Sequence, residues 1–233
     1  MNLRSILLIV LIGSFVSVSG QQLLTPSRSF SHNKPAYLTL EDGSELECTI
    51  DKIKRKKVLI EEVRIIDENG KKQKLKPEDI KFMYLPPSNF DKLAKANSFI
   101  GDATKWNDEK LEQDLLNQGY AYFEYTPVKI KRKTMGLMMQ LINPDFSQEI
   151  QVYDDPLAKK TTSVGVAGVK VAGGNAKSYY VKHSDDEIAI RIKKKDYDEH
   201  FDTLYGNCDS LKSVDPDWSE LVNHIIKYTE CAE

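Results

Sequence analysis

The chain has 233 residues, of which 40% are hydrophobic, and its 33 basic and 35 acidic side chains give a formal net charge of −2. This hydrophobic content is enough for a packed core, and the length allows one large domain or two small ones. A dedicated nucleic-acid-binding protein usually carries a strong basic excess, so the near-neutral balance argues against nucleic acid as the partner.

Residues 1–20 have the features of a signal peptide. Arg4 gives a basic start, an apolar run follows, and Val18 and Gly20 precede polar Gln21 in the small-residue pattern that signal peptidase accepts. The apolar run is shorter than the roughly 20 residues that a membrane-spanning helix needs. We therefore expect export to the periplasm, the outer-membrane surface or the medium, and a mature chain without a membrane span.

The next part of the chain predicts a loose arm followed by a compact β unit. Residues 21–34 are polar and show no periodicity, which is typical of a flexible arm. Residues 35–87 contain short alternating runs separated by Asp42-Gly43 and Asn69-Gly70, two dipeptides that favour tight hairpin turns. Pro77 can open a single helical turn before the last run. The pattern predicts a small barrel-like unit, SH3-like in outline.

Residues 88–118 predict a helical connector, with Leu111, Leu115 and Leu116 on one helix face and Gly119 as the stop signal. From residue 119 onward the period returns to two, which predicts consecutive antiparallel strands.

Three methionines in one of these later strands are expected to fill the core, because methionine packs irregular gaps well; they are Met135, Met138 and Met139.

The end of the chain predicts a helical hairpin that closes the sheet of residues 119–233. The first helix places Tyr197, Phe201 and Leu204 on one face. The second is expected to start with Asp215 as its N-cap and to bury five apolar side chains: Trp218, Leu221, Val222, Ile225 and Ile226.

The cysteines fit an oxidising compartment. Cys208 and Cys231 lie 23 positions apart and are expected to form a disulfide that pins the helical hairpin. Metal binding is the rival interpretation, but the chain has no CxxC or CxxH pair. Cys48 alternates with Leu46 and Ile50, which places it on the apolar face of a strand as a buried free thiol.

The glycine-rich stretch SVGVAGVKVAGGNAKSYYV, residues 163–181, resembles a phosphate loop only in spacing. Gly168 and Gly173 have the separation of a Walker motif, but Gly174-Asn175 replace its lysine and hydroxyl residue. The shift in the parity of the valines indicates a β-bulge, and Gly173–Asn175 indicates a hairpin turn. We therefore expect no nucleotide or other cofactor.

Histidines and paired carboxylates provide weak candidates for chemistry. His183 is followed by Ser184 and two aspartates, but adjacent residues in a turn point apart and do not form a triad. His224 follows Glu220 by four residues, a spacing that usually gives a surface pair. Asp154-Asp155 and Asp185-Asp186 could serve a hydrolase, yet no metal-ligand spacing connects them, and we predict no metal site.

Basic clusters recur at strand ends and turns, and neighbouring acids favour a solvated surface for them. Gathered on one face, they would instead hold anionic glycan, lipid head groups or nucleic acid. The clusters are Lys52–Lys57, Lys71-Lys72, Lys129–Lys133 and Lys193–Lys195.

Tyrosines in two strands supply the candidate ligand surface, because an exposed aromatic face can stack on a sugar or grip a peptide. The candidate residues are Tyr120, Tyr122, Tyr179, Tyr180 and His183.

Four structural features carry a resemblance: the signal ending before Gln21, the opening PAYLTLEDGSELECTI, the segment LKPEDIKFMYLPP and the ending YGNC…YTEC. With them the chain resembles exported, functionally uncharacterised proteins of Bacteroidota, over most of residues 35–231. The shared motifs are structural, so the resemblance transfers no site residues.

These patterns together predict a mainly β protein of the α+β class. They favour an exported, non-enzymatic envelope protein that binds a protein, a peptide or a glycan. The alternative is a periplasmic or secreted hydrolase that uses the loop carboxylates and a histidine.

Overall fold

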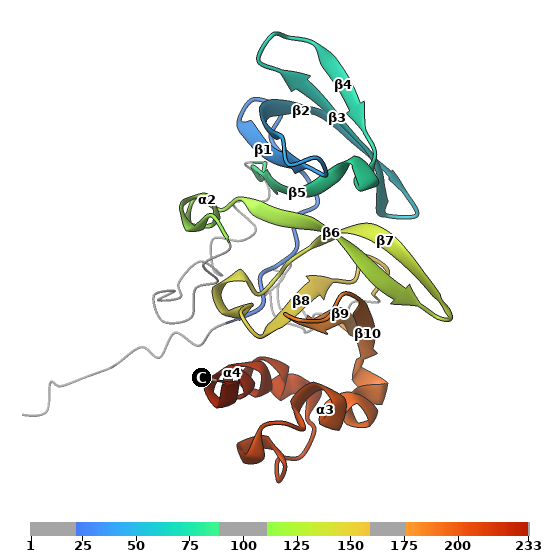
Figure 1. The fold of residues 1–233 in the computed structure, drawn as a ribbon, viewed down its shortest axis with the longest axis vertical. Helices are drawn as coiled ribbons and strands as arrows, with labels where there is room; N and C mark the ends of the chain where they lie inside the picture. Colours follow the sequence, from blue (N-terminus) through green and yellow to red (C-terminus); the bar gives the residue numbers. More distant parts are fainter. Residues whose placement is uncertain (1–21, 89–110, 159–175, 233) are drawn as a thin grey trace, which may run out of the picture.

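The computed structural model describes residues 22–88, 111–158 and 176–232. Within these ranges the chain is mainly β, with helices gathered at its C-terminal end (Figure 1). The expected signal peptide, most of the expected helical connector and residues 163–175 of the glycine-rich stretch lie outside the described residues.

The described strands form one mixed sheet whose order is β4-β3-β2-β1-β5-β6-β10-β9-β8, with β7 paired to β6. The strands are β1 (Pro35–Leu40), β2 (Glu45–Lys56), β3 (Leu59–Asp67), β4 (Lys72–Leu75), β5 (Ile80–Leu85), β6 (Ala121–Ile130), β7 (Lys133–Gln140), β8 (Ile150–Asp154), β9 (Ser178–His183) and β10 (Ala189–Lys193).

Short helices connect and cover the strands. The α-helices are α2 (Gln113–Asn117), α3 (Tyr197–Tyr205) and α4 (Leu221–Ala232), and the 3-10 helices are η2 (Pro77–Asp79), η3 (Pro144–Phe146), η4 (Lys194–Asp196), η5 (Asp209–Leu211) and η6 (Trp218–Glu220).

The prediction of a purely antiparallel sheet in the C-terminal half is wrong at one pair of strands, because β10 runs parallel to β6. The strands β6 to β10 reverse direction at each step, and Leu141, just after β7, makes an antiparallel bridge to Tyr153 of β8. The fifth strand of such a series must run the same way as the first. Its return to the edge of β6 therefore produces the parallel pair.

Strand β6 belongs to two cores at once, because its side chains alternate between the faces of the sheet. Ala121 and Phe123 pack into the core of the β1–β5 part. Tyr122 and Val128, of opposite parity, pack with residues of β7, β8 and β9 in a second core. A third core lies between β8–β10 and the C-terminal helices.

Two predicted hairpin turns are confirmed. Gly43 between β1 and β2 and Gly70 between β3 and β4 have φ values of +84° and +76°, which glycine adopts without strain. The prediction missed a third turn at Lys57 and Val58, whose φ values of +49° and +70° are also left-handed. Neither residue is typical of such a turn, and β-branched valine is especially rare there.

Residues 22–34 form no helix or longer strand, yet side-chain packing and backbone hydrogen bonds hold them against the rest of the protein at several points. Leu23 and Leu24 pack against the helical core, and Phe30 is buried in the core of the β1–β5 part. The backbone N–H of Leu24 donates to the carbonyl of Ile142 at 2.6 Å, and that of Ser27 donates to Gln140 at 3.0 Å. The segment therefore runs along the molecule and contacts both the helical core and the core of the β1–β5 part (Figure 1).

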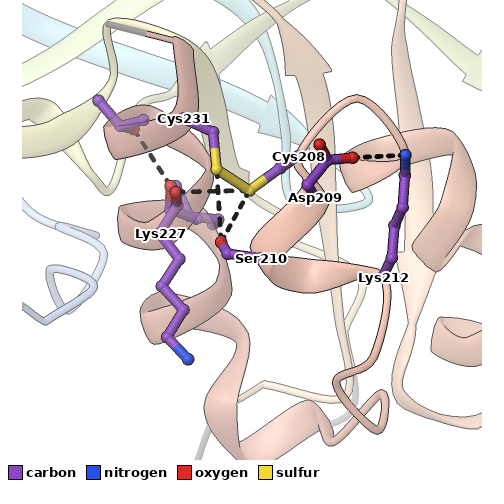
Figure 2. Close-up of a disulfide and its surroundings, with 8 residues drawn as sticks. Cys208, Asp209, Ser210, Lys212, Lys227 and Cys231 are labelled. Carbon is purple, nitrogen blue, oxygen red and sulfur yellow. Dashed lines mark hydrogen bonds and ion pairs between the residues drawn. A yellow bond between two sulfur atoms is a disulfide. The ribbon is translucent and has the colours of Figure 1, made fainter.

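The predicted helical hairpin and its disulfide are confirmed. Cys208 and Cys231 are joined across α4 and η5, next to the hydroxyl of Ser210 (Figure 2). Closing a loop of this length stabilises the fold by about 3 kcal/mol. The predicted cap at Asp215 is wrong. The side chain of Asp217 accepts from the N–H of Ser219 and starts η6, which leads into α4.

Gly136 provides a test of the packing between β6 and β7. The Tyr125 ring lies so close over Gly136 that an added Cβ would overlap its hydroxyl end. We expect Gly136→Ala to lower the free energy of unfolding by about 1–3 kcal/mol, as overpacking does. Urea denaturation measures the change.

Thr134→Ala, at an exposed position on the same strand, is the matched control and should change stability little. Adding Tyr125→Ala to Gly136→Ala should relieve the clash, so that the double variant loses less stability than the sum of the single variants. Strict additivity would contradict the proposed contact.

Candidate functional site

The four candidate tyrosines are buried. Tyr120 and Tyr122 on or beside β6 are 9% and 8% exposed, and Tyr179 and Tyr180 on β9 are 5% and 3% exposed. Tyr179 stacks on Trp218 at 5.5 Å between ring centroids, within the helical core. Packed in this way, these rings offer no face on which a sugar could stack.

His183 and the aspartates Asp154 and Asp155 lie at opposite ends of the β8–β9 pair. His183 is opposite Ile150 in the register, whereas Asp154 is opposite Tyr179, four residues further along. At 3.3 Å per residue the two positions are about 13 Å apart along the strand. The loop carboxylates Asp154 and Asp155 therefore do not converge with His183 into a hydrolytic site.

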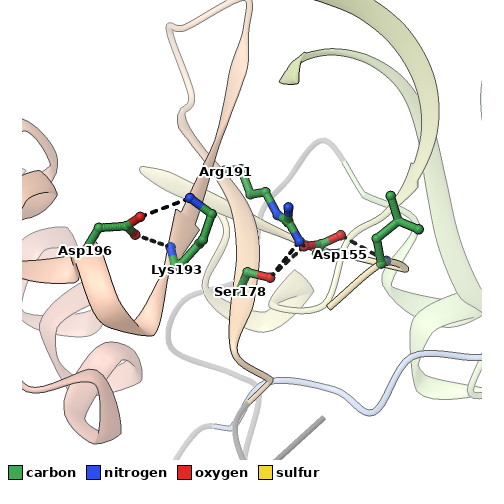
Figure 3. A network of polar contacts seen from close by, with 6 residues as sticks. Asp155, Ser178, Arg191, Lys193 and Asp196 are labelled. Atoms are coloured by element: carbon green, nitrogen blue, oxygen red, sulfur yellow. Dashed lines mark hydrogen bonds and ion pairs between the residues drawn. The ribbon is translucent and has the colours of Figure 1, made fainter. Parts of the chain in front are cut away.

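Asp155 is engaged in a buried ion pair (Figure 3). Its Oδ2 accepts from the Arg191 guanidinium at 2.5–2.6 Å and from the Ser178 hydroxyl at 2.6 Å, and its side chain is fully buried. A buried carboxylate needs such partners to offset its loss of water. The network ties the segment after β8 to β9 and β10, which is a structural role.

His224 is not the surface partner of Glu220 that the sequence predicts. The residue is 3% exposed, and its Nδ1 lies 2.8 Å from the hydroxyl of Tyr197, among the aromatic rings of the helical core. Burial lowers the pKa of this imidazole, because water no longer stabilises its charged form.

Cys48 is confirmed as a buried free thiol on β2. Burial, helped by the nearby charges of Glu47 and Asp67, raises the pKa of its thiol to about 11. At neutral pH the nucleophilic thiolate form is therefore scarce.

A groove lies where the β2–β3 hairpin meets β7 and the end of β8. It is shallow and open to solvent, and its walls enclose about 20 Å³. Its lining residues are Ser27, Arg28, Arg55, Val58, Leu59, Ile60, Phe123, Met138, Met139, Gln140, Asp154 and Pro156. We call it the hairpin groove. A space of this size holds about one water molecule, so the groove is a depression of the surface.

The hairpin groove has an apolar floor and a charged rim. Ile60, Phe123, Met138 and Met139 are buried beneath it, and the apolar lining that solvent reaches is Val58 and the partly buried Leu59. The Arg28 guanidinium, half exposed, pairs with Asp154 at 2.8 Å.

The second rim cation is Arg55, whose guanidinium carbon lies 5.9 Å from the ring centroid of Phe30. This arrangement suits a ligand that combines an apolar group with an anionic one.

Nothing in the sequence signals this groove, because its walls come from the arm, the β2–β3 hairpin, β6, β7 and the end of β8. The residues singled out in the sequence that line it are Arg55 of the Lys52–Lys57 cluster, Met138, Met139 and Asp154. Nothing in the spacing of that cluster connected it to the methionines of β7.

Metal ligands, membrane-spanning helices and known relatives bear further on function. Among the described residues no group of three or more His, Cys, Asp or Glu side chains could hold a metal ion. No helix in the described ranges has the length and apolar character needed to cross a membrane. No protein-family model, curated protein or solved structure matches the chain.

The buried imidazole of His224 predicts a pH-dependent stability. Above about pH 6.5 it is neutral in both the folded and the unfolded chain. Below that pH the unfolded chain takes up a proton that the folded chain resists, so the free energy of unfolding falls by at most about 1.4 kcal/mol per pH unit, until the lowered pKa is reached.

We expect His224→Phe to flatten this dependence between about pH 6.5 and pH 5 in urea denaturation curves. Thr229→Ala is the control, because it alters another buried residue of α4 and keeps the imidazole. It should destabilise the protein and retain the wild-type slope. The same slope in His224→Phe would show that His224 is not the titrating group.

Proposed function

We propose that the protein is an exported, non-enzymatic binding protein of the bacterial envelope. Its hairpin groove binds a short peptide segment of a partner protein, and the observation that supports this is the groove's apolar floor beside the guanidinium groups of Arg28 and Arg55.

The chemistry of the groove favours a peptide over a glycan. Sugars are usually held by exposed aromatic faces, and the candidate tyrosines are buried in cores. The apolar side chains that solvent reaches in the groove, Val58 and Leu59, are aliphatic and suit an apolar side chain of a peptide. The segment we propose carries an apolar side chain next to a carboxylate, from Asp, Glu or a chain terminus.

Arg28 and Arg55 supply the guanidinium groups that would meet the carboxylate. An arginine offers two parallel N–H donors that match the two oxygens of a carboxylate. Arg28 is paired with Asp154, so a ligand carboxylate at that point would compete with a protein one. The Arg55 guanidinium lies over the Phe30 ring at the rim of the groove.

We further propose that residues 35–87 form an SH3-like small barrel. Two features support this: the strand order β4-β3-β2-β1-β5, and the 3-10 helix η2 between β4 and β5. The pairing of β2 with β3 shifts register twice, between Ile50 and Lys52 and between Lys54 and Arg55. Such irregularities bend a strand, which lets a long β2 curve around a small core.

A peptide-display selection against the purified mature chain tests the binding function. We expect enriched peptides to share an apolar residue adjacent to Asp or Glu. Arg55→Gln should weaken their binding, measured by calorimetry, by about tenfold or more, because it removes a charge-assisted hydrogen bond.

Lys81→Gln is the matched control, since Lys81 is an exposed cation on β5 that does not line the groove. It should leave the affinity unchanged. Failure to enrich any shared motif, or equal affinity in Arg55→Gln and the wild type, would contradict the proposed site.

Export has its own test. Expressed with its full sequence in a Gram-negative host, the protein should be found in the periplasm or beyond. Its measured mass should correspond to a chain that begins at Gln21 and contains one disulfide. An uncleaved protein that stays in the cytosol would refute the export assignment and leave the groove hypothesis standing.

A further inference from the structure

The hairpin between β6 and β7 is a separate feature that the groove does not explain. Lys129, Lys131, Arg132 and Lys133 surround its turn, and all four are exposed. The hairpin extends past the neighbouring strands, on the same side in this view as the tip of the β2–β3 hairpin (Figure 1). We call Lys129–Met135 the cationic tip.

The cationic tip lacks the neutralising acids that accompany the other basic clusters. On β2, Lys54 and Lys56 pair with Glu61 at 2.8 and 3.8 Å, and Lys72 at the start of β4 pairs with Asp51 at 2.8 Å. No acidic residue occurs in residues 127–140, and within the described part of the chain none of the tip's four cations forms an ion pair. A solvated, charge-balanced surface therefore does not describe this cluster.

The prediction that Met135 fills the core is wrong. Its side chain is 46% exposed at the cationic tip, whereas Met138 and Met139 on the same strand are buried. Val58, at the tip of the β2–β3 hairpin, is 48% exposed. Val58 and Met139 line the same groove, which places the β2–β3 tip beside β7. Val58 therefore belongs to the hairpin groove, and Met135 is the exposed apolar side chain that accompanies the unneutralised cations.

We propose that the cationic tip docks on an anionic lipid surface. Its lysines and arginine contact the head groups, while Met135 inserts at the boundary between head groups and acyl chains. A soluble polyanion would satisfy the cations equally well but would leave the Met135 side chain in water. The combination of charge with an exposed apolar side chain favours a membrane surface.

This inference goes beyond the peptide groove and does not depend on it. It is tested with the mature chain and two sets of vesicles, one of phosphatidylcholine alone and one of phosphatidylcholine mixed with phosphatidylglycerol. We expect co-sedimentation with the anionic vesicles only, decreasing as salt is added. Each cation near such a surface strengthens partitioning roughly fivefold, so Lys131→Gln combined with Arg132→Gln should weaken it roughly thirtyfold.

Lys71→Gln combined with Lys74→Gln removes the same charge from exposed positions at the other end of the sheet, and it should leave partitioning unchanged. Met135→Ser should weaken binding to anionic vesicles and leave binding to heparin, a soluble polyanion, unaltered.

Three results would overturn the proposal: no binding to anionic vesicles, an equal loss in both charge variants, or tight heparin binding with no effect of Met135→Ser on vesicles. The last result would assign the tip to a soluble polyanion instead. Circular dichroism of each variant confirms that the compared proteins are folded.

Discussion

The pairing of β6 on both of its edges is the constraint on which the rest of the structure depends. One edge binds β5 through its first half and β10 through its second half, and the other edge binds β7 along most of its length. Because side chains alternate along a strand, a one-residue slip of β6 would exchange Phe123 with Glu124 and carry a carboxylate into the β1–β5 core. The register of β6 is therefore specified by two cores at once.

Of the two candidate carboxylate pairs, Asp154 and Asp155 are used in contacts that hold the fold together, whereas Asp185 and Asp186 are exposed. Asp155 joins β9 and β10 through Ser178 and Arg191, and Asp154 meets Arg28 of the N-terminal segment. Glu124 accepts a hydrogen bond from the buried Tyr153 hydroxyl of β8. A carboxylate fixed in this way is oriented by its donors. These contacts give Asp154, Asp155 and Glu124 a structural role.

Local signals predicted local structure well. The two glycine turns, the 3-10 helix at Pro77 and the disulfide follow from residue type and spacing, which act over a few residues or through the oxidising compartment. The predictions that were wrong concerned features that depend on contacts between distant segments. Three features depend on which strand or helix packs beside them: the parallel β6–β10 pair, the buried His224 and the exposed Met135. The periodicity of the sequence does not show which elements pack together. The groove, made from five such segments, was out of reach for the same reason.

Strand β7 connects the groove to the cationic tip. Met135 lies at the tip and Met139 lines the groove, and four residues of extended strand separate them by about 13 Å. Because β7 is paired with β6 along its whole length, this segment is extended. A protein docked through the tip would hold the groove at a fixed height above the lipid, within reach of a peptide segment that emerges from the same surface. The two proposals are thus compatible with one geometry. The hairpin between β6 and β7 contacts the membrane, and the groove lies on the same sheet just above the lipid.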